Sequence, residues 1–339
     1  VGHKFIEAIL EKADDELEIT ILAEEPRIAY DRVHLTEYFS GKSAKDLSLA
    51  RFDFADAHGI DLRLNTKAIA IDIKEQTVTT SMGDVISYDK LVLATGSYAF
   101  VPPIAGNDRE NCFVYRTIED LDAIRAASLN ATSGVVIGGG LLGLEAAKAL
   151  RDLNLETHVV EFAPRLMAVQ IDDLGGKVLR RKIENLGVKV HTQKATQCIE
   201  AGNNAKHVMK FADGSELETD VILFSAGIRP RDELARSSGL ALGERGGIKI
   251  NDYCQTSDEN IYAIGECALW DNKIYGLVAP GYDMARIAAK HILAEETHCF
   301  AGADMSTKLK LMGVDVASVG DAHGMTPNSL SYFYADEDA

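Results

Sequence analysis

The clearest chemical signal in the sequence is a set of three glycines at Gly-x-Gly-x-x-Gly spacing. An apolar run, residues 135–137, leads into them, and an Ala- and Leu-rich stretch follows Gly138, Gly140 and Gly143. In a strand–turn–helix unit the first glycine permits the tight turn, the second lets the backbone approach a diphosphate, and the third lets helix and strand pack closely. The helix N-terminus then offers unpaired N–H groups to the anion. The spacing predicts a dinucleotide site that also includes the two residues before the last glycine, Leu141 and Leu142.

An acidic residue at the end of the next expected strand bears on the choice between the two nicotinamide cofactors. Residues 156–161 read as that strand, and Glu161 follows Gly140 by 21 positions. A carboxylate at this place accepts hydrogen bonds from ribose hydroxyls and repels a 2′-phosphate. We therefore expect NAD(P)H to bind here, with NADH preferred over NADPH.

The start of the chain reads as a second, incomplete copy of the same unit. Residues 1–10 align with residues 142–150, and residues 17–25 form a strand-like run that ends in two acids. By this alignment Gly2 takes the place of the last glycine of a first Gly-x-Gly-x-x-Gly, whose first strand and first two glycines are missing. We expect the shortened turn to weaken flavin binding. The alternative is an unrelated amphipathic helix followed by a strand.

Two nucleotide folds in one chain suggest two cofactors, and three further turns favour FAD in the first fold. Each turn follows an expected strand or opens an expected helix, where backbone N–H groups or an acid can meet a polar ligand. Together the turns supply the following residues: Ala94, Thr95, Gly96, Gly265, Glu266, Pro280 and Gly281.

Composition argues against several classes of function. The 339 residues carry a net charge of −17, which repels phosphate backbones, so we expect no nucleic-acid partner. A surface for docking a basic partner is the alternative use of this charge. No apolar run is long enough to cross a membrane, and the start lacks a signal peptide's apolar stretch, so we expect a cytoplasmic protein. The five cysteines are expected to be buried thiols, and neither they nor the nine histidines have the spacing of a metal site.

The order of these motifs resembles that of the two-dinucleotide-fold flavoprotein reductases. The Ala-Gly-x-Arg-Pro segment at residues 226–230 and the Ile-Tyr-Ala-x-Gly-Glu segment at residues 261–266 belong to the same pattern. Within that superfamily, four more specific segments are similar to the N-terminal part of the large subunit of siroheme-type NAD(P)H nitrite reductases: residues 24–35, 114–120, 264–270 and 277–281. The resemblance covers essentially the whole chain.

The resemblance implies an FAD site in the first fold. It assigns FAD contacts to Gly2, to one of the two acids Glu24 and Glu25, and to Arg32, together with the turns at residues 94–96 and 265–266. Residues 65–68, which end in Ala68, are similar to the strand whose backbone reads the adenine edge.

Two positions depart from the family pattern. Glu266 stands where Asp is commoner, and we regard it as tolerated because the longer side chain still reaches a ribityl hydroxyl or a bridging water. Glu37 stands where ferredoxin-reductase-type relatives have a lysine near the flavin. We therefore assign no flavin-tuning lysine.

The resemblance also assigns residues to the nicotinamide end of the second fold. Glu145, which follows Gly143 by two positions, would hold the carboxamide, and it is the one residue to which we assign a catalytic role. The alternative is a solvated acid that the helix dipole favours. Ala226 and Gly227 would let the backbone lie against the nicotinamide ribose. Hydride transfer is the cofactors' own chemistry, for which the protein supplies stacking, orientation and electrostatics.

The cysteine positions indicate where the electrons go next. Flavin disulfide reductases carry a redox cysteine early in the chain, and residues 1–111 contain none. Single electrons passed to an iron–sulfur centre are the better interpretation, although no cysteine cluster here could hold one. The resemblance places iron–sulfur and siroheme domains C-terminal to this stretch, so we expect the chain alone not to reduce nitrite. A small subunit and a homodimer are further partners that we consider.

We predict an α/β protein with two Rossmann-like, three-layer ββα/αβ domains, the NAD domain being inserted in the FAD domain. The predicted ranges are 1–106 and 229–300 for the FAD domain, 107–228 for the NAD(P) domain, and 301–339 for a truncated α+β interface domain. The last range contains two strand-like runs, residues 307–320 and 331–335. Two rivals stay open: a stand-alone NADH reductase for rubredoxin or ferredoxin, and a flavin-binding scaffold without turnover.

Overall fold

The computed structural model of the protein describes residues 1–12, 17–311, 313–328 and 330. It divides the chain into two compact units. Unit 1 comprises Val1–Val33, Ala44–Tyr98 and Ile228–Asp304. Unit 2 comprises His34–Ser43, Ala99–Gly227 and Met305–Ala339. The predicted domain ranges assign a cofactor to each stretch of chain, and that assignment stays a prediction.

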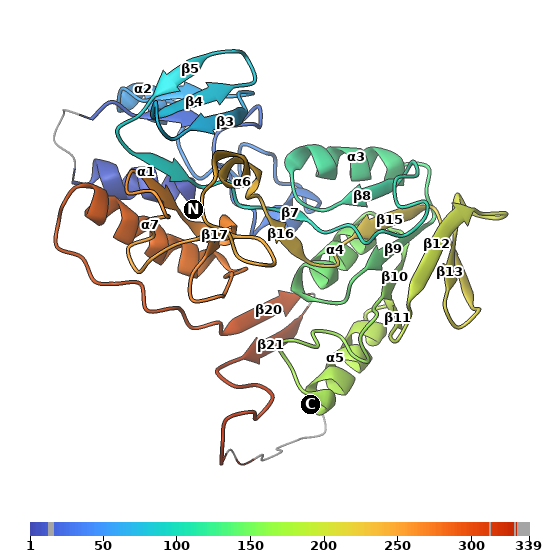
Figure 1. Ribbon diagram of the computed structural model, residues 1–339. Helices are drawn as coiled ribbons and strands as arrows, with labels where there is room; N and C mark the ends of the chain where they lie inside the picture. The colour runs from blue at the N-terminus through green and yellow to red at the C-terminus, as the bar shows by residue number, and fades with distance from the viewer. Residues whose placement is uncertain (13–16, 312, 329, 331–339) are drawn as a thin grey trace. The chain divides into compact units, whose positions relative to one another are not determined.

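Unit 2 is built on a five-stranded parallel sheet with the strand order β11-β10-β9-β15-β8 (Figure 1). Its strands are β8 (Cys112–Val114), β9 (Ser133–Ile137), β10 (Glu156–Val160), β11 (Lys189–His191) and β15 (Val221–Phe224). The middle strands are largely apolar because a parallel sheet is covered on both faces. The helices of this unit are α3 (Ile118–Ser128), α4 (Leu141–Asp152) and α5 (Asp173–Asn185). The predicted α/β fold is confirmed.

Two antiparallel additions complete unit 2. The first is a three-stranded sheet of β12 (Thr196–Ala201), β13 (His207–Phe211) and β14 (Glu216–Thr219). Its apolar side chains share a core with the parallel sheet, to which they contribute Ile199, Met209 and Phe211. The second is a hairpin of β20 (Thr307–Leu311) and β21 (Val314–Ser318), which lies within the first predicted C-terminal run. The second predicted run, residues 331–335, lies outside the described residues.

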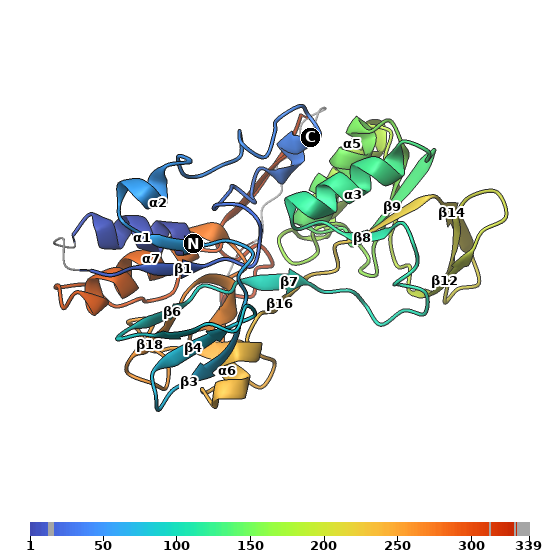
Figure 2. The ribbon, with the colours of Figure 1, turned by 90° about the horizontal axis from the view of Figure 1, so that it is seen from above.

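Unit 1 contains several short parallel strand pairs. One joins β1 (Thr20–Leu22) to β2 (Asp61–Arg63), and another joins β6 (Leu91–Leu93) to β18 (Ile261–Ala263). Helix α1 (Gly2–Leu10) packs along α7 (Val278–Ile292), and Figure 2 shows the two helices side by side. The buried apolar face of α1 supplies Phe5, Ile6 and Ile9 to the core of this unit.

The rest of unit 1 is a meander and short elements around this core. The meander has the order β3-β4-β5, with β3 (Ala68–Asp72), β4 (Thr77–Thr80) and β5 (Val85–Ser87), and it packs against α6 (Glu233–Ser238). Two further pairs are β7 (Ser97–Ala99) with β16 (Ile228–Pro230) and β17 (Ile248–Lys249) with β19 (Ala268–Leu269). The remaining short helices are η1 (Leu35–Tyr38), which belongs to unit 2, and α2 (Phe54–Ala57) and η2 (Gly265–Cys267) of unit 1.

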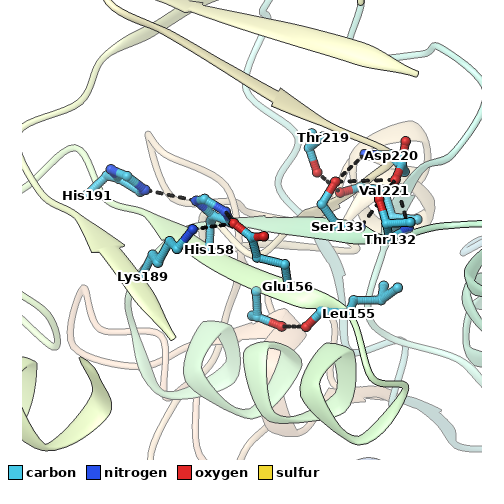
Figure 3. A network of polar contacts seen from close by, with 11 residues as sticks. Thr132, Ser133, Leu155, Glu156, His158, Lys189, His191, Thr219, Asp220 and Val221 are labelled. Atoms are coloured by element: carbon cyan, nitrogen blue, oxygen red, sulfur yellow. Dashed lines mark hydrogen bonds and ion pairs between the residues drawn. The ribbon is translucent and has the colours of Figure 1, made fainter. Parts of the chain in front are cut away.

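A carboxylate ties two central strands of unit 2 together at the edge where they begin (Figure 3). Asp220 directly precedes β15, and its Oδ2 accepts hydrogen bonds from the N–H of Thr132 at 2.8 Å and from the N–H of Ser133 at 3.2 Å. Partial burial opposes ionisation, but these hydrogen bonds hold the pKa of Asp220 below its usual value. The amino ends of β9 and β15 are therefore held in register, which positions their carboxyl ends for the site described below.

Two stacked histidines join β10 to β11 (Figure 3). The rings of His158 and His191 are nearly parallel with centroids 5.3 Å apart, and Nδ1 of His158 lies 3.0 Å from Nε2 of His191. Glu156 contacts the other ring nitrogen of His158 at 3.1 Å. Burial lowers the pKa of both histidines. The positive charge that a protonated His158 would carry lowers the pKa of His191 further.

The histidine pair makes stability depend on pH. Because the folded-state pKa of His158 is lowered, its contribution to stability is present above the unfolded value of about 6.5 and is lost as pH falls. We expect the free energy of urea unfolding to drop between pH 8 and pH 5.5 less steeply in His158→Gln than in the unchanged protein. The exposed His298, replaced in the same way, is the control, and equal slopes for all three proteins would contradict the assignment.

Candidate functional site

In the glycine-rich turn of unit 2, two of the predicted glycines are packed tightly against backbone atoms and the third has open space beside it. At Gly138, where φ is +117°, an added Cβ would lie 2.2 Å from the carbonyl oxygen of Ser225. At Gly143 it would lie 1.9 Å from the carbonyl oxygen of Gly138. At Gly140, the N-cap of α4, it would meet nothing within 4 Å. Two of the predicted glycines are thus demanded by packing, and the third leaves room next to the backbone at the start of α4.

The same edge of the sheet gathers the other predicted residues of this unit. Strands β10 and β15 lie on opposite sides of β9, so their carboxyl ends flank the turn, which is the place where open α/β sheets bind ligands. Ala226 and Gly227 follow β15, and Gly227 has φ +109° with open space around its Cβ position. The N–H of Ser225 donates to the carbonyl of Ile137 at 2.8 Å, which carries the pairing of β15 with β9 to the start of this turn.

Glu161 follows β10 at this edge and is held by two backbone groups. Its Oε2 accepts a hydrogen bond from the N–H of Gly139 at 2.5 Å, and its Oε1 accepts one from the N–H of Ala163 at 2.7 Å. The carboxylate therefore fixes the glycine-rich turn against the end of β10, with one lone pair on each oxygen left for a ligand. This contact to Gly139 was not predicted from the sequence. The available signal was that a glycine also stands between Gly138 and Gly140.

Glu145 lies on α4 and is only partly exposed. Burial raises the pKa of its carboxyl to about 7, although the nearby charge of His34 acts in the opposite direction. The group is thus poised to exchange a proton near neutral pH, in contrast to the solvated first-turn acid that was the alternative.

Residues His34–Ser43 pack on unit 2, although the chain on both sides of them belongs to unit 1. The Tyr38 hydroxyl donates to Asp122 at 2.5 Å, and Arg125 donates to the Tyr38 carbonyl at 2.7 Å. The Tyr115 hydroxyl is 3.1 Å from Thr36 Oγ1. Within this segment the ammonium of Lys42 forms an ion pair with Glu37, the position at which we assigned no flavin-tuning lysine. This packing was not predictable from the sequence, because it depends on contacts between side chains that are far apart in the chain.

In unit 1 the predicted flavin residues converge where α1 and α7 begin. An added Cβ at Gly2 would lie 3.3 Å from Cβ of Ala94, and one at Gly281 would lie 3.3 Å from Cα of Gly265. Strand pairing of β6 with β18 brings the turns after these strands together. Pro280 is buried beside Gly281 in the first turn of α7. Four segments far apart in sequence therefore meet at one place through small residues.

Glu266 is oriented by a hydroxyl of the neighbouring turn. The buried Ser97 donates from Oγ to Oε2 of Glu266 at 2.7 Å. Gly96 and Gly265 both have positive φ, +69° and +77°, which is the conformation that a glycine tolerates best. Glu266 therefore has a hydrogen-bond partner in the neighbouring turn, and its tolerance in place of Asp stays a prediction.

An arginine that the sequence reading did not single out connects two predicted parts of unit 1. The N–H of Arg231 donates to the carbonyl of Gly96 at 2.9 Å, and Oγ1 of Thr95 donates to the Arg231 carbonyl at 2.6 Å. Its guanidinium lies 2.6 Å from Glu24, which also pairs with Lys67 at 3.2 Å. Partial burial opposes ionisation, but the two cations hold the pKa of Glu24 below its usual value. The signal was its position directly after the Ala-Gly-x-Arg-Pro segment.

Glu25 has a separate set of partners. It accepts a hydrogen bond from the Tyr30 hydroxyl at 2.6 Å and pairs with Arg32, whose guanidinium lies 4.8 Å from the centre of the Tyr30 ring. The N–H of Asn65 donates to the Glu25 carbonyl at 3.2 Å, so the segment that leads to Ala68 starts beside these acids. Both carboxylates follow β1, and the choice between them as the ribose acid stays open.

The cysteines do not form a cluster in the part of the chain that the structure describes. Cys254 and Cys267 are buried, and burial raises the pKa of the Cys254 thiol to about 12. The expectation that all five are buried is wrong for Cys299, which is exposed, and for Cys112 and Cys198, which are partly exposed because they lie on short edge strands. Among the described residues there is no group of three metal-ligating side chains, and no helix long and apolar enough to span a membrane.

Comparison with known proteins places this arrangement in a family. The family model described as pyridine nucleotide-disulphide oxidoreductase matches residues 6–291. The chain belongs to this family. The predicted membership among two-dinucleotide-fold flavoprotein reductases is therefore confirmed, and so is an oxidoreductase fold.

Individual relatives narrow the similarity. The chain is 58% identical, over 339 residues and 99% of its length, to the nitrite reductase (NADH) large subunit of Escherichia coli, of which it covers 40%. It is 59% identical, over 98% of its length, to the nitrite reductase [NAD(P)H] large subunit of Klebsiella oxytoca, of which it covers 35%. The chain thus spans well under half the length of these relatives. Among solved structures, an NAD-dependent persulfide reductase from A. fulgidus matches with a TM-score of 0.88 at 28% identity, over 94% of this chain and 62% of that one.

Proposed function

We propose that this chain is the electron-input part of an NAD(P)H-dependent nitrite reductase large subunit, in which NADH reduces a bound FAD. The observation that carries the proposal is the 58% identity to such a subunit over 99% of the chain. The absence of any cysteine from residues 1–111 supports it, because a disulfide-reducing relative would carry a redox cysteine there. The bound flavin would supply the redox chemistry, taking a hydride from NADH and passing electrons onward.

Unit 1 fits FAD at the convergence of its turns. The close approach of Gly2 to Ala94 and of Gly281 to Gly265 leaves backbone rather than side chains at this place. We assign the diphosphate to the start of α1, where helix N–H groups favour an anion. Glu24 or Glu25 would accept the ribose hydroxyls, with Arg32 and the Ala94–Thr95–Gly96 turn alongside. Glu266, held by Ser97, would orient the ribityl chain, and the backbone before Ala68 would contact adenine.

Unit 2 fits NADH at the carboxyl edge of its sheet. The open backbone at Gly140, with Leu141 and Leu142 behind it, would receive the diphosphate, and the lone pairs left on Glu161 would receive the adenosine ribose. Gly227 leaves space for the nicotinamide ribose beside Ala226. Glu145, with a pKa of about 7, would hold the carboxamide as either a proton donor or an acceptor. Glu161 is already held in place by two backbone N–H groups, and orientation of this kind lowers the barrier.

The activity of the whole protein is part of the same proposal. Electrons would pass to iron–sulfur and siroheme centres in further domains, where nitrite would be reduced to ammonium in the cytoplasm as a step of nitrate assimilation. A small subunit and a second copy of the large subunit would be its partners. The stand-alone rubredoxin or ferredoxin reductase is the rival, and the high identity to nitrite reductase subunits over 98–99% of the chain disfavours it.

The proposal predicts a split between two activities of the isolated chain. After loading with FAD, the chain should oxidise NADH with ferricyanide as acceptor, since this needs only the two nucleotide sites. It should form no ammonium from nitrite, because the cysteines of the described residues form no site for an iron–sulfur centre. Glu184→Gln, an exposed charge change on α5, serves as the control. Bound flavin without NADH oxidation would support a scaffold instead, and sustained NADH-dependent ammonium formation would contradict the proposal.

A further inference from the structure

The loop between β10 and α5 carries a single cation close to the proposed adenosine ribose site. Arg165 is the only lysine or arginine between Glu161 and Gly176. The loop is pinned to the glycine-rich turn, because the N–H of Met167 donates to the carbonyl of Gly139 at 2.9 Å. An added Cβ at Gly139 would lie 2.6 Å from the Leu166 side chain. The residue next to Arg165 therefore touches the turn that Glu161 also holds.

The guanidinium of Arg165 is hydrogen-bonded to residues of the same loop and to the first residue of α5. Its Nη1 donates to Oδ1 of Asp173 at 2.6 Å and its Nε donates to the carbonyl of Ile171 at 3.0 Å. Nη2 reaches the carbonyl of Ala168 at 3.4 Å. The alkyl stem lies on Gly176, where an added Cβ would be 2.8 Å from Cδ of Arg165. All three guanidinium nitrogens thus have partners in the loop or at the first residue of α5, and a glycine in α5 makes room for the stem.

This arrangement keeps Arg165 apart from Glu161. Glu161 is fixed by backbone N–H groups at the turn, whereas Arg165 is drawn away by Asp173, whose side chain is 80% exposed against 21% for the arginine. A 2′-phosphate bound at this edge would meet a carboxylate and lack a guanidinium. Phosphate recognition in proteins commonly relies on arginine, whose planar group can donate two parallel hydrogen bonds.

We propose that Asp173 is a specificity-determining residue, which keeps Arg165 from the 2′-phosphate of NADPH and so reinforces the preference for NADH. The inference rests on the proposed nucleotide site of unit 2. Asp173 acts through Arg165 and touches no cofactor atom itself. It follows that removal of the Glu161 carboxylate alone leaves part of the discrimination against NADPH in place. Release of Arg165 from Asp173 should then remove the rest of that discrimination.

The test measures binding of two probes, 5′-AMP and adenosine 2′,5′-bisphosphate, by calorimetry. Glu161→Ala is expected to narrow the preference between them only in part. Adding Asp173→Asn should raise the affinity for the bisphosphate relative to 5′-AMP by about tenfold, as one charge-assisted hydrogen bond would. Adding Arg165→Met to this pair of changes should remove the gain. The ratio of kcat/KM for NADPH to kcat/KM for NADH should rank these variants in the same order as the ratio of the two affinities.

The controls separate a specific effect from general ones. Glu184→Gln makes the same charge change on α5 and should leave the ratio of the two affinities unmoved. Thermal unfolding of each variant identifies loss of folding, and Arg165→Gln replaces Arg165→Met if the latter unfolds. A ratio that is unchanged by Asp173→Asn, or a gain that survives removal of Arg165, overturns the inference while the NADH site stands. If the unchanged protein binds neither NADH nor 5′-AMP, the proposed nucleotide site and the inference fall together.

Discussion

Alanine at Gly143 is expected to abolish NADH use by destroying the turn, whereas alanine at Gly140 should leave the fold intact and still weaken nucleotide binding. At Gly143 the added methyl would lie 1.9 Å from a backbone oxygen, which cannot move without shifting β9 or α4. Overpacking of this kind costs on the order of 3 kcal/mol or more. We expect the free energy of urea unfolding to fall by that amount, together with NADH oxidation.

Alanine at Gly140 is expected to affect nucleotide binding much more than stability. The residue has φ −79°, which alanine adopts freely, and an added Cβ meets nothing within 4 Å. Stability should change by less than about 1 kcal/mol, the usual cost of alanine at an N-cap. The methyl would, however, occupy the space next to the backbone that we assign to the diphosphate, so affinity for NAD⁺ should fall at least tenfold. Calorimetric titration of Gly140→Ala with NAD⁺ decides the matter, and unchanged affinity would mean that the diphosphate lies elsewhere.

Glu145→Gln is expected to stabilise the protein above neutral pH while it impairs the reaction with NADH. Burial raises the folded-state pKa of this carboxyl from its ordinary value of 4.5 to about 7. Its favourable contribution to stability is therefore present below pH 4.5 and is lost as pH rises towards 7. At pH 8 the ionised group costs roughly 3 kcal/mol, from about 1.4 kcal/mol for each pKa unit. Glutamine keeps the shape and cannot ionise, so the variant should be more stable by about that amount.

The functional half of this prediction moves in the opposite direction. If Glu145 holds the carboxamide, its replacement should lower kcat/KM for NADH by tenfold or more and should remove any dependence of that constant on pH near 7. Unfolding curves and steady-state rates at pH 5, 6, 7 and 8 measure both effects. Glu184→Gln, at an exposed position, should change neither. A variant that gains stability but reacts with NADH normally at every pH would show that Glu145 is a buried acid without a role in binding.

The parts of the fold that were predictable are those in which a local backbone rule acts alone. Gly138 and Gly143 could be assigned from spacing because each position excludes a Cβ through contacts within one strand–turn–helix unit. The strands before Ala94 and Gly265 could be placed for a similar reason, since apolar runs that end in small residues have few other uses in a parallel sheet. The convergence of these turns then followed from the pairing of β6 with β18.

The parts that were not predictable depend on long-range contacts between side chains. Arg231 bridges Glu24 and the Gly96 turn, and Asp173 holds Arg165, but a charged residue in a sequence does not reveal its partner. The segment His34–Ser43 packs on unit 2, although the residues before and after it belong to unit 1. This packing depends on contacts of Tyr38 with residues far away in the sequence. The raised pKa of Glu145 could not be predicted from the sequence either, because the burial that causes it depends on the surrounding fold.

The most direct test of the account is an anaerobic titration of the FAD-loaded chain with NADH. We propose that the chain binds both NADH and FAD and that a hydride passes from NADH to the flavin. We expect the flavin's visible absorbance band to bleach as NADH is added, with completion near one NADH per flavin, and we expect Gly143→Ala to prevent this. A flavin spectrum that stays oxidised in excess NADH, in a chain shown to contain FAD, would contradict it.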